Sequence, residues 1–139
     1  MSYKIVGKYI KQLDFKIPNS KAFALLAKDI SNYKIHIDIK SNQLNKNIIE
    51  IETTLKLNPI KESLEIINTK IIYSSIIELE NKDIDKQKLE KIILIEVPSK
   101  IYSDLRKIFI FVFESSGFKD IKINENIDFE KLYNLKKNY

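Results

Sequence analysis

The chain is short of several residue types that specialised sites require. Its 139 residues include no cysteine, no tryptophan, a single histidine and only two glycines. Without cysteine there is no disulfide framework, no thiolate metal site and no thiol nucleophile. With so few glycines, neither of the usual glycine-rich loops that cradle phosphate can be built. These absences leave little from which to make a catalytic centre.

Long hydrophobic runs are also missing. The start, MSYKIVGK, has no apolar segment of the signal-peptide kind. No stretch approaches the roughly 20 apolar residues that a membrane-spanning helix needs. We therefore expect a cytoplasmic protein without direct membrane insertion. The length and the ordinary balance of 44% hydrophobic and 31% charged residues predict a single domain over residues 1–139.

The charge is moderately basic, with 24 Lys and Arg against 19 Asp and Glu, a formal net charge of +5. A basic surface is typical of nucleic-acid binding. However, Arg106 is the only arginine, and the lysines are spread along the chain between acidic residues. The abundance of Ile, Lys and Asn also indicates a compositional bias that raises the isoelectric point without a selected function. We predict no nucleic-acid partner, and a basic RNA-binding oligomer remains the alternative from another class.

Candidate catalytic residues are few. His36 lies between Ile35 and Ile37 on the expected solvent face of a strand, which favours a surface histidine over a general base or metal ligand. Glu50 and Glu52 are two residues apart and resemble a carboxylate pair, but a solvated sheet face explains them more simply. The sequence therefore predicts no enzyme, no catalytic residue, no metal and no cofactor.

Alternating apolar residues predict four β-strands, over residues 3–17, 33–40, 48–57 and 63–79. In the first strand one face is expected to hold Tyr3, Ile5, Tyr9, Leu13, Phe15 and Ile17. Residues 19–32 are interpreted as an apolar connection. Helices are expected later: a short one capped by Asp85, a long one over residues 99–116, and one capped by Asp128. Strands followed by helices predict an α+β fold, with an antiparallel sheet that has one wet face.

The long helix has an unusual middle. Pro98 and Ser99 predict its start and Gly117 its end, and its main apolar stripe faces the sheet. From Ile108 to Phe113 no polar residue interrupts the sequence, so Ile110 and Phe111 point away from that stripe. Leaving two such side chains in water would forgo about 1.5–3 kcal/mol each. A second copy of the chain would bury them, whereas the core helix of a monomer is the simpler alternative.

Several short segments, in this order, resemble the SecB family of protein-export chaperones from about Tyr3 to Tyr133. The matching segments are YIKQLDFKIPNS (9–20), IHIDIKSNQL (35–44), LEI (64–66), VPSKIYSDLRKIF (97–109), SSGF (115–118) and IDFEKLY (127–133). No single segment is decisive, but six in the right order and spacing are specific.

The resemblance implies a fold, an assembly and a function. The fold is a four-stranded antiparallel sheet with helices packed on one face, assembled as a dimer of dimers. In that homotetramer the long helices are sandwiched between two sheets, which places Ile108, Ile110 and Phe111 at the oligomer interface. The function is that of an ATP-independent holdase, which binds unfolded secretory precursor proteins and delivers them to the Sec translocase through SecA. A SecB-like chaperone dedicated to a toxin–antitoxin pair is the alternative within the family.

The resemblance also implies two sites. The client-binding groove would be formed by Phe15, Phe23, Leu25, Leu26, Ile35, Ile37, Ile39, Phe129, Leu132 and Tyr133, for each of which core packing is the alternative. The SecA-facing surface would be the outer sheet face, at Gln12, Asp14, Lys16 and Glu65. In the family this face is acidic and docks a basic SecA tail. Gln12 and Lys16 depart from that pattern, which argues against an unchanged contact with SecA.

Overall fold

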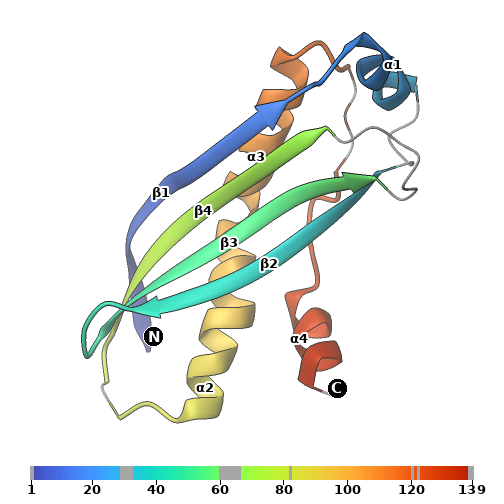
Figure 1. Cartoon of the computed structure of the whole chain (residues 1–139). Helices are drawn as coiled ribbons and strands as arrows, with labels where there is room; N and C mark the ends of the chain where they lie inside the picture. The colour runs from blue at the N-terminus through green and yellow to red at the C-terminus, as the bar shows by residue number, and fades with distance from the viewer. Residues whose placement is uncertain are drawn as a thin grey trace.

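Four antiparallel strands form one sheet in the order β1-β4-β3-β2, and a long helix crosses one of its faces (Figure 1). The computed structural model describes residues 2–28, 33–59, 67–81, 83–119, 121 and 123–137. The order places β1 and β2 at the two edges of the sheet. The elements are β1 (Tyr3–Lys16), α1 (Ser20–Lys28), β2 (Tyr33–Gln43), β3 (Ile48–Pro59), β4 (Asn68–Leu79), α2 (Lys86–Lys91), the π-helical turn η2 (Ile92–Glu96), α3 (Val97–Ser115) and α4 (Phe129–Lys137).

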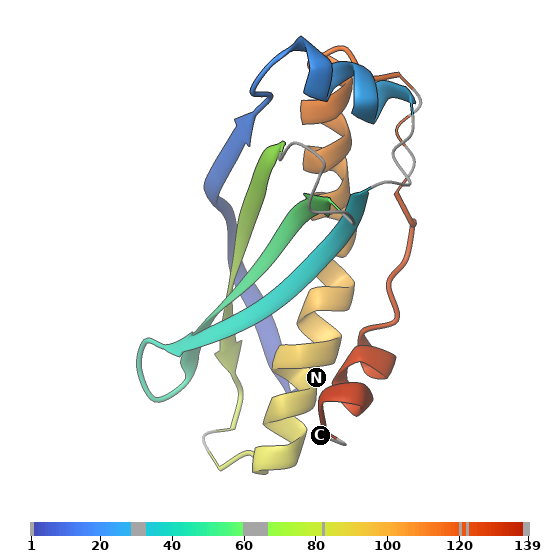
Figure 2. The same ribbon diagram turned by 45° about the vertical axis from the view of Figure 1, so that its right-hand side comes forward.

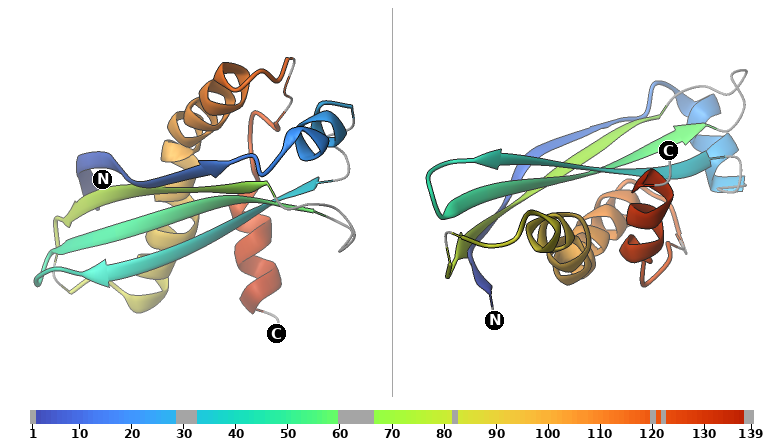
Figure 3. Two further views of the ribbon diagram at one scale, coloured as in Figure 1. Left: turned by 45° about the horizontal axis from the view of Figure 1, so that its top comes forward. Right: turned by 90° about the horizontal axis from the view of Figure 1, so that it is seen from below.

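The predicted alternation is confirmed in the two central strands. Ile51 and Leu55 of β3 and Ile71 and Ile77 of β4 are fully buried against the helices. We call this the inner face of the sheet, and the opposite face the outer face. Helices α3 and α4 both lie on the inner side (Figures 2 and 3). The sheet and helices confirm the α+β class, whereas residues 63–66 of the predicted fourth strand lie outside the described residues.

Two β-bulges in β1 change which side chains face inward. The register between β1 and β4 shifts between Ile5 and Gly7 and again between Ile10 and Gln12. Because each extra residue reverses the facing of those that follow, strict alternation fails in the middle of the strand. The prediction that Tyr9 shares a face with Tyr3 is therefore wrong. Tyr9 lies on the outer face, where its hydroxyl donates to Glu50.

Residues 19–32, interpreted as a connection, contain the helix α1 instead. Its first turn is capped by Asn19, whose Oδ1 accepts a hydrogen bond of 2.9 Å from the backbone N–H of Ala22. Ala22 and Leu26, four residues apart, are buried and hold the helix against the rest of the molecule. An asparagine cap followed by good helix formers explains why this segment is helical.

The long helix begins earlier than predicted. Elements α2, η2 and α3 follow one another without a break, so residues 86–115 form one helical run. The run passes through a π-helical turn just before Pro98, which has no N–H to offer the preceding carbonyls. Ser99 does not cap a helix start, because its hydroxyl donates to the Ile95 carbonyl at 2.6 Å. Asp85 likewise makes no side-chain cap bond to α2.

The predicted end of α3 is confirmed at Gly117, which has a φ of 104°. The N–H of Phe118 donates to the carbonyl of Phe113 at 3.1 Å, and that of Gly117 to Glu114 at 3.2 Å. This pair of bonds is a Schellman motif, which needs a residue in the left-handed conformation at the glycine position. The rings of Phe113 and Phe118 pack 5.4 Å apart and seal the turn.

Helix α3 buries one face and exposes part of the other. Leu105, Phe109 and Phe113 are fully buried on the sheet, whereas Phe111 is 71% exposed. Ile108 and Ile110 are half-buried. Their place in an oligomer interface stays a prediction. In the described part of the chain, no helix is long and apolar enough to cross a bilayer.

Candidate functional site

An apolar groove lies beside the edge strand β2. Helix α3 packs on β3 and β4, so the inner face of β2 projects beyond the cover that this helix provides. Ile35, Ile37 and Ile39 point to this side and are only half-buried. The C-terminal segment and α4 lie on the same side of the sheet (Figure 2).

The other wall of the groove is formed by α4 and the segment that precedes it, and hydrogen bonds attach this segment to the long helix α3. The Tyr102 hydroxyl donates to the backbone carbonyl of Asn124 at 2.7 Å, and Nε of Arg106 donates to that of Ile123 at 3.2 Å. These bonds fix the chain between α3 and α4 along the helix. Burial raises the pKa of the Tyr102 phenol, so this group remains a neutral donor at physiological pH.

Helix α4 is fixed at its start and at its middle. Asp128 caps it as predicted, since its Oδ1 accepts a 3.0 Å bond from the N–H of Lys131. The ring of Phe129 packs edge-on against Tyr102 at 6.2 Å. The Tyr133 hydroxyl donates to Glu90 of α2 at 3.1 Å, and burial together with this bond raises the pKa of Tyr133. The wall is therefore a defined surface rather than a loose tail.

Two adjoining hollows lie between these walls, and we call them together the β2–α4 groove. The smaller has a volume of about 60 Å³ and is lined by Ile37, Ile39, Leu94, Phe129, Leu132 and Tyr133. The larger, of about 430 Å³, shares Ile37 and Leu132 with it and adds Lys34, Ile35, His36, Tyr102, Ile123, Asn124 and Ile127. The lining is mainly aliphatic and aromatic, so the groove suits apolar side chains of another molecule.

The structure brings together some of the predicted groove residues and separates others. The predicted residues of β2 and α4 line the groove: Ile35, Ile37, Ile39, Phe129, Leu132 and Tyr133. Those nearer the N-terminus lie elsewhere. The ring of Phe15 packs on that of Phe113 with centroids 5.1 Å apart, and the ring of Phe23 packs on that of Phe118 with centroids 4.7 Å apart. On α1, Leu26 is 1% exposed and Leu25 is half-buried.

Sequence reasoning missed Leu94, Tyr102, Ile123 and Ile127 as groove residues. Leu94 lies in the π-helical turn, where helical periodicity does not predict which way it points. Ile123 and Ile127 stand between the helix stop at Gly117 and the cap at Asp128, where a connection has little reason to be apolar. That excess of isoleucine was the available signal.

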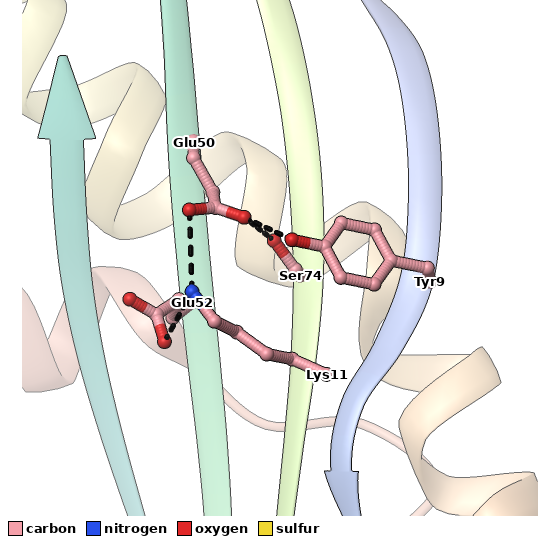
Figure 4. A network of polar contacts seen from close by, with 5 residues as sticks. All are labelled: Tyr9, Lys11, Glu50, Glu52 and Ser74. Atoms are coloured by element: carbon pink, nitrogen blue, oxygen red, sulfur yellow. Dashed lines mark hydrogen bonds and ion pairs between the residues drawn. The ribbon is translucent and has the colours of Figure 1, made fainter. Parts of the chain in front are cut away.

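The outer face carries a polar network centred on Glu50 (Figure 4). The Tyr9 hydroxyl and the Ser74 hydroxyl both donate to Glu50 Oε2, the latter at 2.7 Å. Lys11 Nζ lies 3.4 Å from Glu50 Oε1 and 3.4 Å from Glu52 Oε1. Because Ser74 is small, the side chains of Tyr9 and Lys11 can cross β4 to reach β3.

These contacts correct the prediction for Glu50. Glu50 and Glu52 do lie on the outer face, but Glu50 is only 7% exposed and is not a solvated residue. The hydrogen bonds from Ser74 and Tyr9, with a smaller effect of Lys11, hold the pKa of Glu50 below its usual value. The network therefore stabilises a buried carboxylate. Among the described residues, no three His, Asp or Glu side chains gather in a metal-binding group.

The remaining predicted residues of the outer face do not form a uniformly acidic surface. Gln12 Nε2 donates to Asp14 Oδ2 at 2.6 Å. Lys16 is exposed, and Asp14 lies opposite Lys70 of β4. Glu65 lies outside the described residues. His36 is exposed on β2, as predicted.

Comparison with known proteins identifies the family. The sequence model for the preprotein translocase subunit SecB matches residues 1–139. The chain belongs to the SecB family. A Pelagibacter ubique (strain HTCC1062) relative, provisionally named a protein-export protein SecB, is 39% identical over 99% of this chain and 98% of its own. The protein-export protein SecB of Anaplasma phagocytophilum (strain HZ) is 24% identical over 94% of this chain and 89% of its own.

A solved structure shows the same fold. The SecB-like chaperone Rv1957 of Mycobacterium tuberculosis, in complex with a ChAD peptide from the Rv1956 HigA1 antitoxin, superposes with a TM-score of 0.62. The match covers 88% of this chain and 90% of that one at 7% sequence identity. Membership of the SecB family, export-type relatives and this fold together make the chain a SecB-type chaperone.

Proposed function

We propose that this chain is a cytoplasmic, ATP-independent holdase that binds unfolded secretory precursor proteins and has no enzymatic activity of its own. The observation that carries the proposal is the β2–α4 groove, an apolar hollow of two parts at the edge of the sheet. An unfolded chain exposes the aliphatic and aromatic side chains that such a groove accepts. A ligand that binds only the unfolded state opposes folding by mass action, so no nucleotide is needed.

Two leucines of α4 provide a matched test. Leu132 is 41% exposed and lines both hollows, whereas Leu135 is 52% exposed on the same helix and lines neither. The assay is the aggregation of a denatured secretory precursor diluted into buffer without nucleotide. Loss of an apolar contact of about 1.5–3 kcal/mol predicts that Leu132→Asp needs about tenfold more protein for half-suppression. Leu135→Asp should act like the unsubstituted protein.

The outcomes distinguish client binding in the groove from client binding elsewhere and from the absence of holdase activity. Equal suppression by both variants would place client binding elsewhere and overturn the assignment of the groove. No suppression by the unsubstituted protein would overturn the holdase proposal itself. Suppression should persist in high salt, because apolar association is far less salt-sensitive than binding to phosphates.

Assembly as a dimer of dimers is part of the proposal. Phe111 is 71% exposed on α3, with half-buried Ile108 and Ile110 beside it, and a second helix layer would cover these side chains. Several grooves on one tetramer would bind one long client with an avidity that no single groove has. Phe111→Asp should lower the mass measured by light scattering or cause aggregation, and an unchanged mass would contradict this assembly.

Delivery to the Sec translocase through SecA completes the proposal. The export names of the relatives support it. The charges of the outer face do not match a basic docking tail, because Lys16 is exposed there and Asp14 faces Lys70. Delivery would therefore require a contact of different chemistry from the one that the family resemblance implies.

The second candidate function is that of a chaperone dedicated to a single antitoxin, because Rv1957, a SecB-like chaperone of the same fold, is in complex with an antitoxin peptide. At 7% identity this likeness concerns the fold alone. A dedicated chaperone would suppress aggregation of one small protein and not of several unrelated precursors. Measuring suppression with unrelated clients therefore distinguishes the two functions.

A further inference from the structure

The cations of the outer sheet face are arranged differently at its two ends. Where β1 begins and β4 ends, Lys4 pairs with Glu78 at 3.8 Å, and farther along β1 Lys11 pairs with two glutamates. The opposite end carries a group that we call the basic patch. It consists of Lys16, Lys34, His36, Lys56 and Lys70. The ion pairs found within the described residues involve none of these five side chains.

Strand register places three members of the basic patch side by side. His36 of β2 lies opposite Lys56 of β3, and Lys56 lies opposite Lys70 of β4. Both lysines are half-buried. Like charges directly opposite each other destabilise a sheet. Asp14 lies next in the row, opposite Lys70, but it accepts a hydrogen bond from Gln12 and makes no ion pair with Lys70.

A shallow hollow of about 250 Å³ lies on this row. His36, Lys56 and Lys70 contribute to its lining, together with Thr54 and Ile72. It offers cations beside an aliphatic side chain and a hydroxyl, which suits a carboxylate residue followed by a small apolar one. Side chains on one face of a strand recur every two residues, at about 6.6–6.8 Å. An extended peptide laid on the sheet has the same spacing.

We propose that the basic patch binds an acidic, extended segment of another protein. The carboxylates of that segment would supply the counter-charges that Lys56 and Lys70 lack within the sheet. The centre of the site differs from the β2–α4 groove, because Lys56 and Lys70 lie on the outer face and line neither of its hollows, whereas Lys34 and His36 of the edge strand β2 border both sites. The proposal therefore does not depend on client binding.

The surroundings favour a peptide over a nucleic acid. The hollow is also lined by Asp38 and Glu52, and Asp14 is close by on β1, so carboxylates interrupt the positive charge. A continuous phosphate backbone would be repelled at those points, whereas a peptide can place its carboxylates selectively. The basic patch contains no arginine, and it has no Phe, Tyr or Trp ring to serve as a stacking platform for successive bases.

The test measures binding of a labelled peptide in which Glu alternates with Ser and Leu, by fluorescence anisotropy at low salt. A matched peptide with Gln in place of Glu and a poly-U RNA are the comparison probes. The Lys56→Gln/Lys70→Gln double variant should raise the Kd for the Glu peptide about tenfold. Lys88→Gln, an exposed lysine of α2, removes charge elsewhere and should leave the Kd unchanged.

Each outcome decides the proposal. Preference for the Glu peptide, lost in the double variant but not in the control, would support it. Equal binding of the Glu and Gln peptides, or an unchanged Kd in the double variant, would overturn it. Tighter binding of RNA through the same lysines would assign the patch to phosphate instead. Thermal unfolding of the double variant confirms that it folds, and its aggregation suppression should remain normal even if the patch proposal is correct.

Discussion

The two faces of the sheet treat buried polar groups in opposite ways. On the inner face, the hydroxyls of Tyr3, Thr53, Thr69 and Ser75 are buried without a hydrogen-bond partner in the described part of the chain. On the outer face, the buried carboxylate of Glu50 accepts bonds from Tyr9 and Ser74 and lies beside Lys11. A neutral hydroxyl can be carried in an apolar layer at modest cost, whereas a charge requires partners.

This difference separates stability from binding in the molecule. The inner face is stabilised by apolar burial under α3, and the part of it at β2 that α3 does not cover is left for binding. The outer face is held by directional bonds at the Glu50 network, whereas the lysines at its other end form no ion pair with another described residue. On each face, one region is covered or bonded by other parts of the molecule and another is not. The uncovered regions are the β2–α4 groove and the basic patch, which are the proposed sites.

The largest effect is expected from the apolar core of the inner face. Phe109 is fully buried between α3 and the sheet, so Phe109→Ala should lower the free energy of unfolding by about 3–5 kcal/mol. Urea denaturation followed by circular dichroism measures this change. Lys107→Ala, at an exposed position of the same helix, is the control and should change stability by less than about 0.5 kcal/mol. A similarly small loss of unfolding free energy in both variants would contradict stabilisation of the inner face by apolar burial under α3.

An intermediate effect is expected from the charge on the outer face. Glu50→Gln weakens the bonds from Tyr9 and Ser74 and should cost about 1–3 kcal/mol at neutral pH. Because folding lowers the pKa of Glu50, its contribution is present above the ordinary glutamate pKa and is lost as pH falls through the folded value. The difference between variant and parent should therefore shrink in acid.

Urea denaturation at neutral and strongly acidic pH checks this dependence. Glu78→Gln is the matched control, since Glu78 lies on the same face in a weak ion pair with Lys4 at 3.8 Å. It should cost less than about 0.5 kcal/mol at any pH. A stability difference for Glu50→Gln that stays constant with pH would show that its charge is not what the network stabilises.

The smallest effect has the opposite sign. Thr53 is 0% exposed and its hydroxyl has no hydrogen-bond partner among the described residues, so Thr53→Val should raise the free energy of unfolding by about 1 kcal/mol. Thr54→Val, at the next residue on the outer face, should give no such gain because Thr54 is only half-buried. Destabilisation by Thr53→Val would mean that its hydroxyl is bonded, and the contrast between the faces would then disappear.

Much of the fold could be predicted from local patterns. The alternation in residues 33–40 and 48–57 predicted β2 and β3, because a half-buried strand has a side-chain period of two. Gly117 and Asp128 predicted the end of α3 and the start of α4, because each relies on its own backbone chemistry. The α+β class followed from the order of these segments.

The predictions failed where an element depended on a partner distant in sequence. Gly7 within β1 indicates a bend or bulge, and a bulge lies there, but the register that turns Tyr9 outward exists only relative to β4. Serine is a common helix-capping residue, but Ser99 lies inside a helical run that begins before Pro98. Half of the groove was also missed, because Leu94 and Ile123 meet β2 only after the chain has folded back on itself.

The sequence by itself determined which side chains are apolar, where the helices stop and that β2 has one apolar face, because these depend on residues close along the chain. Tertiary structure alone decided that α3 covers β3 and β4 but leaves β2 open, and that Lys56 and Lys70 stand side by side. Both depend on strand order and register, which arise from contacts between segments far apart in sequence. The groove and the basic patch therefore emerge only when the sheet is assembled.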